Sequence, residues 1–279
     1  MIPHGNLSKL SNRLAGKSER RIPENLLELN YCAAWFLIAL SKVPLDRRLV
    51  FKGGTALKQC YYGDYRFSED LDFTLIAETP FEDIQKGLEA VYQEVKNASG
   101  IIFRFKESDR KAHPNSHTFY LEYEGPIPRA AKLPQIKVDI TIKEKLVFKP
   151  VHKPVLRPYS EFSDLPGDSK IQVYSLEEIA TEKLVALMDR ARTEPRDLYD
   201  IWHLIQNSAV DLQELKDPVE KKLEFRGKTL AGVAQEFSAK KDRYEKLWEN
   251  RLAAQMLELP EFEGVFRSVQ RELKKVLPK

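Results

Sequence analysis

The chain carries a two-part motif, which reads Lys52-Gly-Gly-Thr-Ala-Leu-Lys58 and, after a short interval, Tyr65-Arg-Phe-Ser-Glu-Asp-Leu-Asp72. A hydrophobic run over residues 49–51 precedes the glycine pair, which predicts a strand that ends in a tight turn. A short helix is expected to begin near Thr55. The sequence therefore predicts a strand, a glycine turn and a helix before the second half of the motif.

A second strand, predicted over residues 70–75, carries two carboxylates. Asp70 and Asp72 are two residues apart, and side chains at this spacing on a strand project from the same face. The apolar residues of the strand point to the core instead: Leu71, Phe73 and Leu75. A glycine turn offers backbone N–H groups to a polyphosphate, and paired carboxylates bind its magnesium ions. This pattern favours nucleotidyl transfer.

Two simpler interpretations compete with a nucleotide site. A Gly-Gly pair alone is more typical of a plain strand-to-helix turn, and the spacing here matches neither the P-loop nor the dinucleotide fingerprint. Asp70 and Asp72 would, alternatively, lie on the solvated face of an edge strand. Asp is disfavoured in strands, however, and two carboxylates on one face repel each other unless a cation lies between them. The turn and the carboxylates together therefore favour the nucleotide site.

A third carboxylate is expected from a later strand, predicted over residues 136–142. Its apolar residues alternate with a polar face that carries Asp139. Three carboxylates from two adjacent strands suit a two-metal site, in which the ions lie roughly 3.5–4 Å apart and stabilise the attacking and leaving oxygens. Asp139 is therefore the predicted third metal ligand beside Asp70 and Asp72.

The rest of the chain predicts a mixed α/β domain over residues 1–160 and a helical domain over residues 161–279. The first domain is expected to hold helices over 24–42 and 80–97 and strands over 101–105 and 118–123. A proline-rich connector, 149–168, follows. Beyond it the pattern is helical over 175–190, 195–205, 211–224, 229–238, 241–256 and 262–276, with Ser175 and Glu178 forming a capping box.

Composition and charge argue against a membrane-spanning protein, a disulfide-stabilised protein and a zinc protein. The net charge is only +3 over 279 residues, so contact with nucleic acid must rely on local basic clusters. The longest apolar stretch, 31–40, is too short for a bilayer, which needs about 20 residues. The two cysteines, Cys32 and Cys60, form neither a disulfide framework nor a zinc pattern. We therefore expect a cytoplasmic protein without a membrane span, and a monomer by default.

The predicted helical domain contributes three further candidates. Lys183 falls on the buried stripe of its helix, where a lysine either snorkels to solvent or reaches across the domain cleft to neutralise a triphosphate. Asp197 and Asp200 share one face of the next helix. Asp197 is also favoured in a first helical turn by the helix dipole alone. An Asp placed against Lys183 would fix the charge and the orientation of that lysine.

No competing catalytic pattern stands out. His113 and His117 are predicted in a loop, and Pro114 between them prevents the helix that a shared metal would need. Basic residues gather in three clusters, which are either solvated faces or contacts to a phosphate backbone. They are Arg104, Lys106, Arg110 and Lys111; Arg190, Arg192 and Arg196; and Lys221, Lys222, Arg226 and Lys228.

Together these residues resemble the AbiEii/AbiGii toxin family, the nucleotidyltransferase half of type IV (AbiE) toxin–antitoxin systems, with the mycobacterial MenT toxins among its members. The resemblance covers most of the chain, and its first motif is the most specific. Its four motifs are Lys52–Leu57 with Arg66–Asp72, Lys137-Val-Asp139, Glu182-Lys183-Leu-Val-Ala186, and Arg196-Asp197-Leu-Tyr-Asp200.

The resemblance implies a polymerase-beta-like nucleotidyltransferase fold that uses Mg²⁺ with a nucleoside triphosphate. By similarity, Ser68 and the turn with Gly53, Gly54 and Thr55 would hold phosphates, together with Arg66. Asp70 and Asp72 would bind metal. Lys183 would contact the triphosphate, and Asp197 or Asp200 would complete the site. Some members of the family append nucleotides to the 3′ end of tRNA, and others are known as GTP-binding growth inhibitors.

We therefore expect in-line attack of an acceptor hydroxyl on the α-phosphate of an NTP, with pyrophosphate leaving. The expected acceptor is the 3′ end of tRNA, so that translation and growth are inhibited, and a cognate antitoxin is the expected protein partner. Two alternatives stay open. One is nucleotidyl transfer to a small molecule or protein, and the other is nucleotide binding without turnover.

Overall fold

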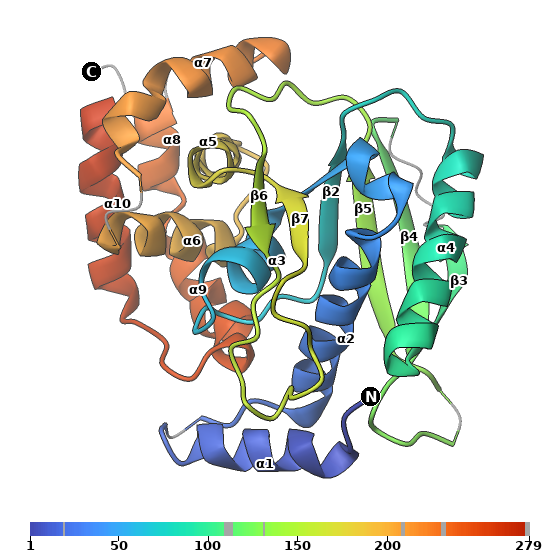
Figure 1. Cartoon of the computed structure of the whole chain (residues 1–279). Coiled ribbons are helices and arrows are strands. Elements are labelled where there is room, and N and C mark those ends of the chain that lie inside the picture. The colour runs from blue at the N-terminus through green and yellow to red at the C-terminus, as the bar shows by residue number, and fades with distance from the viewer. Residues whose placement is uncertain (19, 109–113, 131, 208–209, 230–232, 277–279) are drawn as a thin grey trace. The chain divides into compact units, whose positions relative to one another are not determined.

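The computed structural model describes residues 1–279 except 19, 109–113, 131, 208–209, 230–232 and 277–279 (Figure 1). The chain forms two compact units, Met1–Glu144 with Pro150–Val173 and Lys145–Lys149 with Tyr174–Lys279. The sequence predicted a division after residue 160. The structure places residues up to Val173 in the first unit, because the segment that ends there adds a strand to the sheet of that unit.

Within the described residues, the first unit contains a seven-stranded sheet in the order β3-β4-β5-β2-β1-β7-β6. β2 pairs with β5 and β1 with β7 in parallel, whereas the remaining neighbours are antiparallel. This mixed sheet confirms the predicted fold class. The strands are β1 (Leu49–Lys52), β2 (Leu71–Leu75), β3 (Ile102–Ser108), β4 (Ser116–Glu124), β5 (Gln135–Thr141), β6 (Val151–Pro154) and β7 (Lys170–Val173).

The proline-rich stretch predicted as a connector, 149–168, contains β6, and β7 begins two residues after its end. The prediction of a connector was wrong for residues 151–154. β6 is the edge strand of the sheet, and Pro154 is its last residue, a position where the missing N–H of proline is tolerated. Pro158, Pro166 and Gly167 fall between the two strands, and Pro150 directly precedes β6, as the turn-forming character of these residues predicts.

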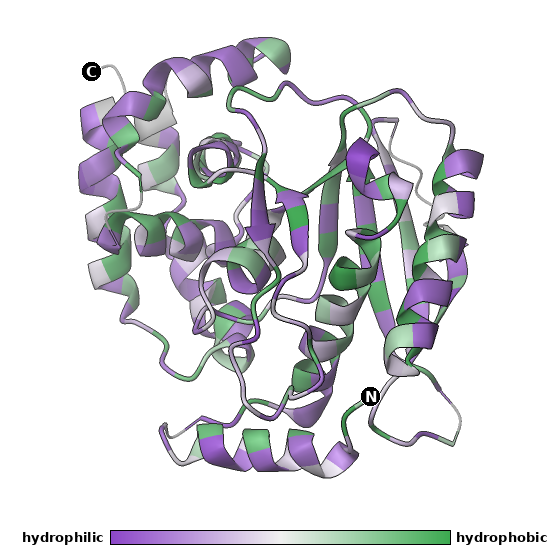
Figure 2. Ribbon diagram, viewed as in Figure 1, coloured by the Kyte–Doolittle hydropathy of each residue, from purple (hydrophilic) through white to green (hydrophobic). Residues whose placement is uncertain are grey.

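Helices of the first unit cover its sheet and shape its core. α2 packs against α1, α4 and β7, and its residues 30–40 are buried all round, as expected of a helix that is apolar on every side. In Figure 2 the ribbon of α1 alternates between hydrophobic and hydrophilic residues along its length. The helical segments are α1 (His4–Ala15), α2 (Glu24–Leu40), η1 (Pro44–Arg48), α3 (Gly53–Ala56), the π-helical η2 (Leu57–Tyr61) and α4 (Phe81–Ser99).

The central strands divide into a buried face and a polar face. Phe51 in β1 and Phe73 in β2 are partners in the strand register, with ring centroids 5.3 Å apart, and both are buried. In β5 the residues Ile136, Val138 and Ile140 are buried while the residues between them are half-buried, which confirms the predicted alternation. On the other face of these strands, Lys52, Asp72 and Asp139 are half-buried.

The second unit is helical in the part that the structure describes. α6 lies at its centre and contacts α5, α9 and α10. Ser175 caps α5 and accepts a hydrogen bond from the Glu178 N–H at 3.3 Å, as the capping signal predicted. The helical segments are α5 (Leu176–Leu187), α6 (Pro195–Gln206), η3 (Leu212–Leu215), α7 (Lys216–Phe225), α8 (Val233–Ala239), α9 (Lys241–Leu252), η4 (Ala253–Gln255) and α10 (Phe262–Val276). None of the described helices has the length and apolar composition that crossing a bilayer requires.

Candidate active site

Two carboxylates lie side by side on the polar face of the sheet. Asp72 in β2 and Asp139 in β5 are partners in the parallel register, so their side chains share one face. Asp139 is held by Thr118 of β4, whose Oγ1 donates a hydrogen bond to Oδ2 at 2.7 Å. On the other flank, Lys52 of β1 is the partner of Asp72 in the strand register. The predicted adjacency of the two strands is confirmed.

The amine of Lys52 crosses this row of side chains. Its Nζ donates to the hydroxyl of Thr141, which lies two residues beyond Asp139 on β5, at 2.9 Å. A lysine and two carboxylates thus occupy neighbouring positions across three strands. The cation next to Asp72 offsets part of the repulsion between the two acidic groups.

Asp70 lies one residue before β2 rather than inside it. The hydroxyl of Thr55, buried in α3, donates to the backbone carbonyl of Asp70 at 2.5 Å. Leu71 is fully buried, whereas Asp70 and Asp72 on either side of it are half-buried. The alternation of burial is consistent with the two carboxylates sharing the face opposite to Leu71, as the sequence predicted.

The glycine turn fits closely against this row. Gly53 has a φ of +80°, in the left-handed region, and a Cβ there would be 2.6 Å from Oδ2 of Asp72. A Cβ on Gly54 would clash with the guanidinium of Arg66. The helix begins at Gly53 rather than near Thr55, so the turn and the helix start coincide.

Arg66 and Ser68, predicted to hold phosphates, lie in the segment between η2 and β2. Arg66 is only 2% exposed, and its Nη1 donates to the backbone carbonyl of Phe67 at 3.3 Å. Ser68 is also buried. The structure brings Arg66 to the back of the glycine turn, where it supports Gly54.

Lys58 is a residue of this region that sequence reasoning did not single out. It lies in η2 and is 1% exposed, and its Nζ donates to the Gly63 carbonyl at 2.5 Å and to the Tyr159 hydroxyl at 2.8 Å. The ammonium also lies 4.4 Å from the centroid of the Phe67 ring. Burial lowers its pKa to about 7, and the charge of Asp64 raises it only in part. The one available signal was its place directly after the glycine motif.

In the second unit, Lys183 is enclosed by two acidic groups of α6. Its Nζ lies 2.6 Å from Oδ1 of Asp197 and 2.7 Å from Oδ2 of Asp200. Arg192 donates from Nε to the other oxygen of Asp197 at 2.7 Å. Burial alone raises the pKa of Asp197, but the charges of Lys183 and Arg192 outweigh it and hold that pKa below its usual range. The structure therefore brings the three predicted residues of this unit together.

Glu178, the predicted partner of Ser175 in the capping box, is buried and orients its surroundings. Its carboxylate accepts hydrogen bonds from the N–H groups of Val147 and Phe148 and lies 2.8 Å from Nζ of the buried Lys222. The Glu178 carboxylate thus accepts from these two N–H groups instead of from the Ser175 N–H, which would be its partner in the predicted capping box. It ties residues 145–149 to the helical unit.

Comparison with known proteins identifies the family. The profile described as "Nucleotidyl transferase AbiEii toxin, Type IV TA system" matches residues 35–270, most of the chain. This chain belongs to the AbiEii family of nucleotidyltransferase toxins. No curated protein sequence matches it.

Solved structures agree with the fold of an AbiEii toxin. MenT4, the nucleotidyltransferase toxin Rv2826c from Mycobacterium tuberculosis H37Rv, is 18% identical with a TM-score of 0.62, over 97% of this chain and 89% of MenT4. JHP933 from Helicobacter pylori is 18% identical with a TM-score of 0.52, over 91% of this chain and 93% of JHP933. At these identities the likeness concerns the fold alone.

The carboxylates of this AbiEii protein suit a divalent cation by their chemistry. Asp72 and Asp139 offer oxygen ligands from adjacent strands, the donor type that Mg²⁺ prefers. Among the described residues, the structure gathers no three His, Cys, Asp or Glu side chains into a group able to hold a metal ion. The pair therefore fits Mg²⁺, and the assignment of all three aspartates as ligands stays a prediction.

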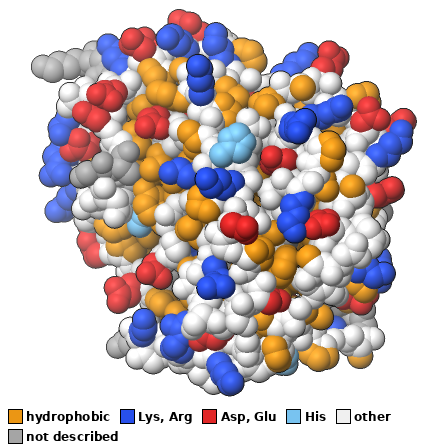
Figure 3. Space-filling model, viewed as in Figure 1, with side chains coloured by type: hydrophobic (Ala, Val, Ile, Leu, Met, Phe, Trp, Pro, Cys, Tyr) orange, Lys and Arg blue, Asp and Glu red, His pale blue; other side chains and the backbone are white. Residues whose placement is uncertain are grey.

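The basic clusters, expected to be either solvated faces or contacts to a phosphate backbone, are largely paired with acidic groups. Lys and Arg side chains on the face seen in Figure 3 are interspersed with Asp and Glu rather than gathered in one patch. Arg110, Lys111 and His113 lie outside the described residues. The pairs are Arg104 with Glu124, Lys106 with Glu122, Arg190 with Glu236, Arg192 with Asp197, Arg196 with Glu194, Arg226 with Glu182 and Lys228 with Asp189. His117, predicted in a loop, lies in β4.

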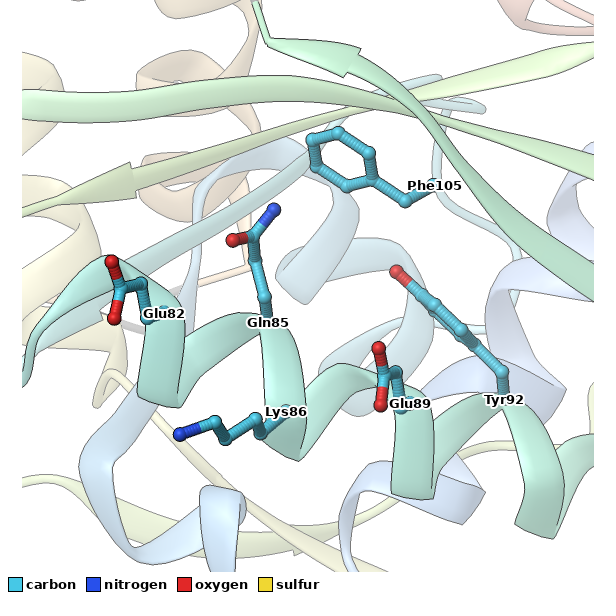
Figure 4. A pocket seen from close by; sticks show the side chains of 6 residues that line it. All are labelled: Glu82, Gln85, Lys86, Glu89, Tyr92 and Phe105. Atoms are coloured by element: carbon cyan, nitrogen blue, oxygen red, sulfur yellow. The ribbon is translucent and has the colours of Figure 1, made fainter.

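A separate pocket lies between α4 and β3 (Figure 4). Its volume is about 470 Å³, and none of the predicted site residues line it. The lining side chains are Glu82, Gln85, Lys86, Glu89, Tyr92 and Phe105.

Proposed function

We propose that this AbiEii toxin transfers a nucleoside monophosphate from an NTP to an acceptor hydroxyl, with pyrophosphate leaving. The proposed acceptor is the 3′ end of tRNA, so that transfer inhibits translation and growth. The observation that carries the proposal is the pairing of Asp72 with Asp139 directly beside the glycine turn at Gly53. Membership of the AbiEii family supports the same reaction class.

Each group of the first unit has a role in this proposal. Asp70 and Asp72, with Asp139 as the third ligand, would hold Mg²⁺, which stabilises negative charge on the phosphate oxygens when bound. The turn of Gly53 and Gly54 would lie against the phosphates. A carboxylate of the site would assist deprotonation of the acceptor hydroxyl.

The proposal extends to the remaining residues by the motifs of the family. Arg66, which is buried behind Gly54, would hold the turn in shape for the phosphates, and Ser68 would contact them. Lys183 is proposed to contact the triphosphate. Asp197 and Asp200, which fix its ammonium group, would keep it charged and oriented.

Incubation of the purified protein with Mg²⁺, each α-labelled NTP and total tRNA tests the proposal. Label in RNA is the expected result. Label in a small molecule or in protein would instead support nucleotidyl transfer to that kind of acceptor. Tight NTP binding without a product would support nucleotide binding without turnover. Asp70→Ala should abolish transfer without loss of folding. Glu69→Ala, which removes the exposed neighbouring acid, is the matched control and should retain transfer.

A further inference from the structure

A row of tyrosine rings runs from the edge strand β6 toward the glycine turn. The ammonium of Lys153 in β6 lies 5.2 Å from the ring centroid of Tyr61. The ring centroids of Tyr61 and Tyr62 are 6.3 Å apart, and those of Tyr62 and Tyr65 are 5.9 Å apart. Three aromatic rings and a cation therefore form one continuous set of contacts at the end of η2.

The inner end of this row reaches the candidate active site. The guanidinium carbon of Arg66 lies 5.6 Å from the ring centroid of Tyr65, and the same guanidinium packs against Gly54. Tyr65 is only 2% exposed, whereas Tyr61 and Tyr62 are half-buried and accessible. The accessible rings are thus connected through Tyr65 and Arg66 to the turn beside Asp72.

The outer end of the row carries the ammonium of Lys153. Lys153 is the partner of Ile171 of β7 in the strand register, whereas the exposed Lys170 and His152 project from the opposite face of these two strands. A backbone hydrogen bond of 2.7 Å from the Leu156 N–H to the Gln59 carbonyl holds the chain after β6 against η2. An exposed acid, Asp64, lies between Tyr62 and Tyr65 in the chain.

Cations beside accessible aromatic rings are the combination that binds single-stranded nucleic acid. Bases of any type stack on the rings, and the cations neutralise the backbone phosphates. We propose that Tyr61 and Tyr62 form a stacking surface for unpaired bases of an RNA strand, and that Lys153 contacts its backbone. Only the direction of the RNA strand, with its 3′ end toward Gly53, rests on the proposed function.

Direct binding tests this inference apart from catalysis. The probe is a fluorescein-labelled single-stranded RNA of ten nucleotides, and fluorescence anisotropy without NTP gives its affinity for the full-length protein. Tyr61→Ala and Tyr62→Ala should each weaken binding by about 5- to 150-fold, the usual effect of losing one base–aromatic stack. Tyr61→Phe and Tyr62→Phe keep the rings and should retain wild-type affinity.

Two further variants sharpen the test. Lys153→Gln should flatten the slope of log affinity against log salt by about 0.7, the value for one phosphate contact on a single strand. Phe225→Ala removes an aromatic side chain that is 50% exposed on α7, and it should leave binding unchanged. Thermal unfolding of each variant checks that it is folded.

The outcomes separate this inference from the proposed function. RNA binding that depends on both rings, in a protein without transferase activity, would uphold the stacking surface and overturn the proposed reaction. Absence of RNA binding by the wild type would overturn the stacking surface, and so would Tyr→Ala variants that bind RNA with the affinity of the wild type. Weaker NTP binding with unchanged RNA binding would overturn it as well, and would assign the rings to the base of the NTP.

Discussion

The carboxylate of Asp72 occupies the space that a side chain at position 53 would need. A Cβ on Gly53 would lie 2.6 Å from Oδ2 of Asp72, and the φ of +80° at Gly53 already disfavours any residue except glycine. The turn and the proposed metal ligand are therefore packed as one unit. A change in either residue is expected to disturb the other.

Gly53→Ala is predicted to abolish transfer, because the new methyl group displaces the Asp72 carboxylate. The left-handed backbone conformation at this position should also lower the free energy of unfolding by about 1–2 kcal/mol. Gly100→Ala is the matched control, since Gly100 has a φ of +78° with no neighbour within 4 Å of its Cβ position. Urea unfolding and the transfer assay measure both variants. Retention of transfer by Gly53→Ala at a similar loss of stability would contradict the proposed packing.

Thr118→Val is predicted to slow transfer by about tenfold, since it removes a hydrogen bond of the usual net strength from the Asp139 carboxylate. It should also raise the Mg²⁺ concentration needed for half-maximal activity. Thr118→Ser keeps the hydroxyl and serves as the control. An unchanged Mg²⁺ dependence in Thr118→Val would argue that Asp139 does not act as a metal ligand.

Lys183→Met is predicted to destabilise the helical unit by about 3–5 kcal/mol, because two buried carboxylates lose their shared cation. The double variant with Asp200→Asn should recover part of this loss in urea unfolding. If Lys183→Met unfolds like the wild type but fails to transfer, Lys183 acts on the nucleotide and not on the stability of the unit.

The same network predicts a stability loss in acid. The pKa of Asp197 is lower in the folded protein than in the unfolded chain. Its contribution to stability is therefore present above the unfolded pKa, about 4, and is lost as the pH falls through the folded value. Urea unfolding between pH 2 and pH 6 should show this loss in the wild type and less of it in Lys183→Met. Parallel curves for the two proteins would count against the ion pair.

Lys58→Met is predicted to remove a pH dependence of the free energy of unfolding above pH 7. The folded pKa of Lys58, about 7, lies below the unfolded value of 10.5, so the unfolded chain binds the extra proton between these values. The stability of the wild type relative to Lys58→Met should therefore rise from pH 7 to pH 10, by up to about 1.4 kcal/mol per pH unit. Lys42→Met, which alters an exposed lysine, should leave the wild-type dependence intact. Equal pH profiles for the wild type and Lys58→Met would show that the amine stays charged.

The fold of the central strands was predictable because their side chains alternate. In the sequence, Leu71 and Phe73 flank Asp72, and apolar residues of β5 flank Asp139. The alternation therefore indicates which side chains of each strand point to the core and which to the polar face. β6 was missed because its four residues lie in a proline-rich stretch, and β7 was missed because it has only four residues. Such short strands are determined by the sheet edge that they join, which a local pattern does not contain.

The candidate site was predictable where neighbours in sequence are also neighbours in space. The glycine turn and the aspartates of β2 belong to this class, and the pairing of Lys183 with α6 follows from adjacent helices. The burial of Lys58 depends on Tyr159, which is distant in the sequence. The neutralisation of Arg104 likewise depends on Glu124 of the neighbouring strand. Partners of this kind are known only once the chain has folded.

The position of the label in the NTP distinguishes nucleotidyl transfer from transfer of the terminal phosphate. The wild-type protein is incubated with Mg²⁺, tRNA and one NTP that carries the label on either its α- or its γ-phosphate. Nucleotidyl transfer predicts label in RNA from the α-labelled NTP alone, with the γ-label recovered in pyrophosphate, and no label in RNA with Asp72→Asn. Label in RNA from the γ-phosphate, or undiminished transfer by Asp72→Asn, would contradict it.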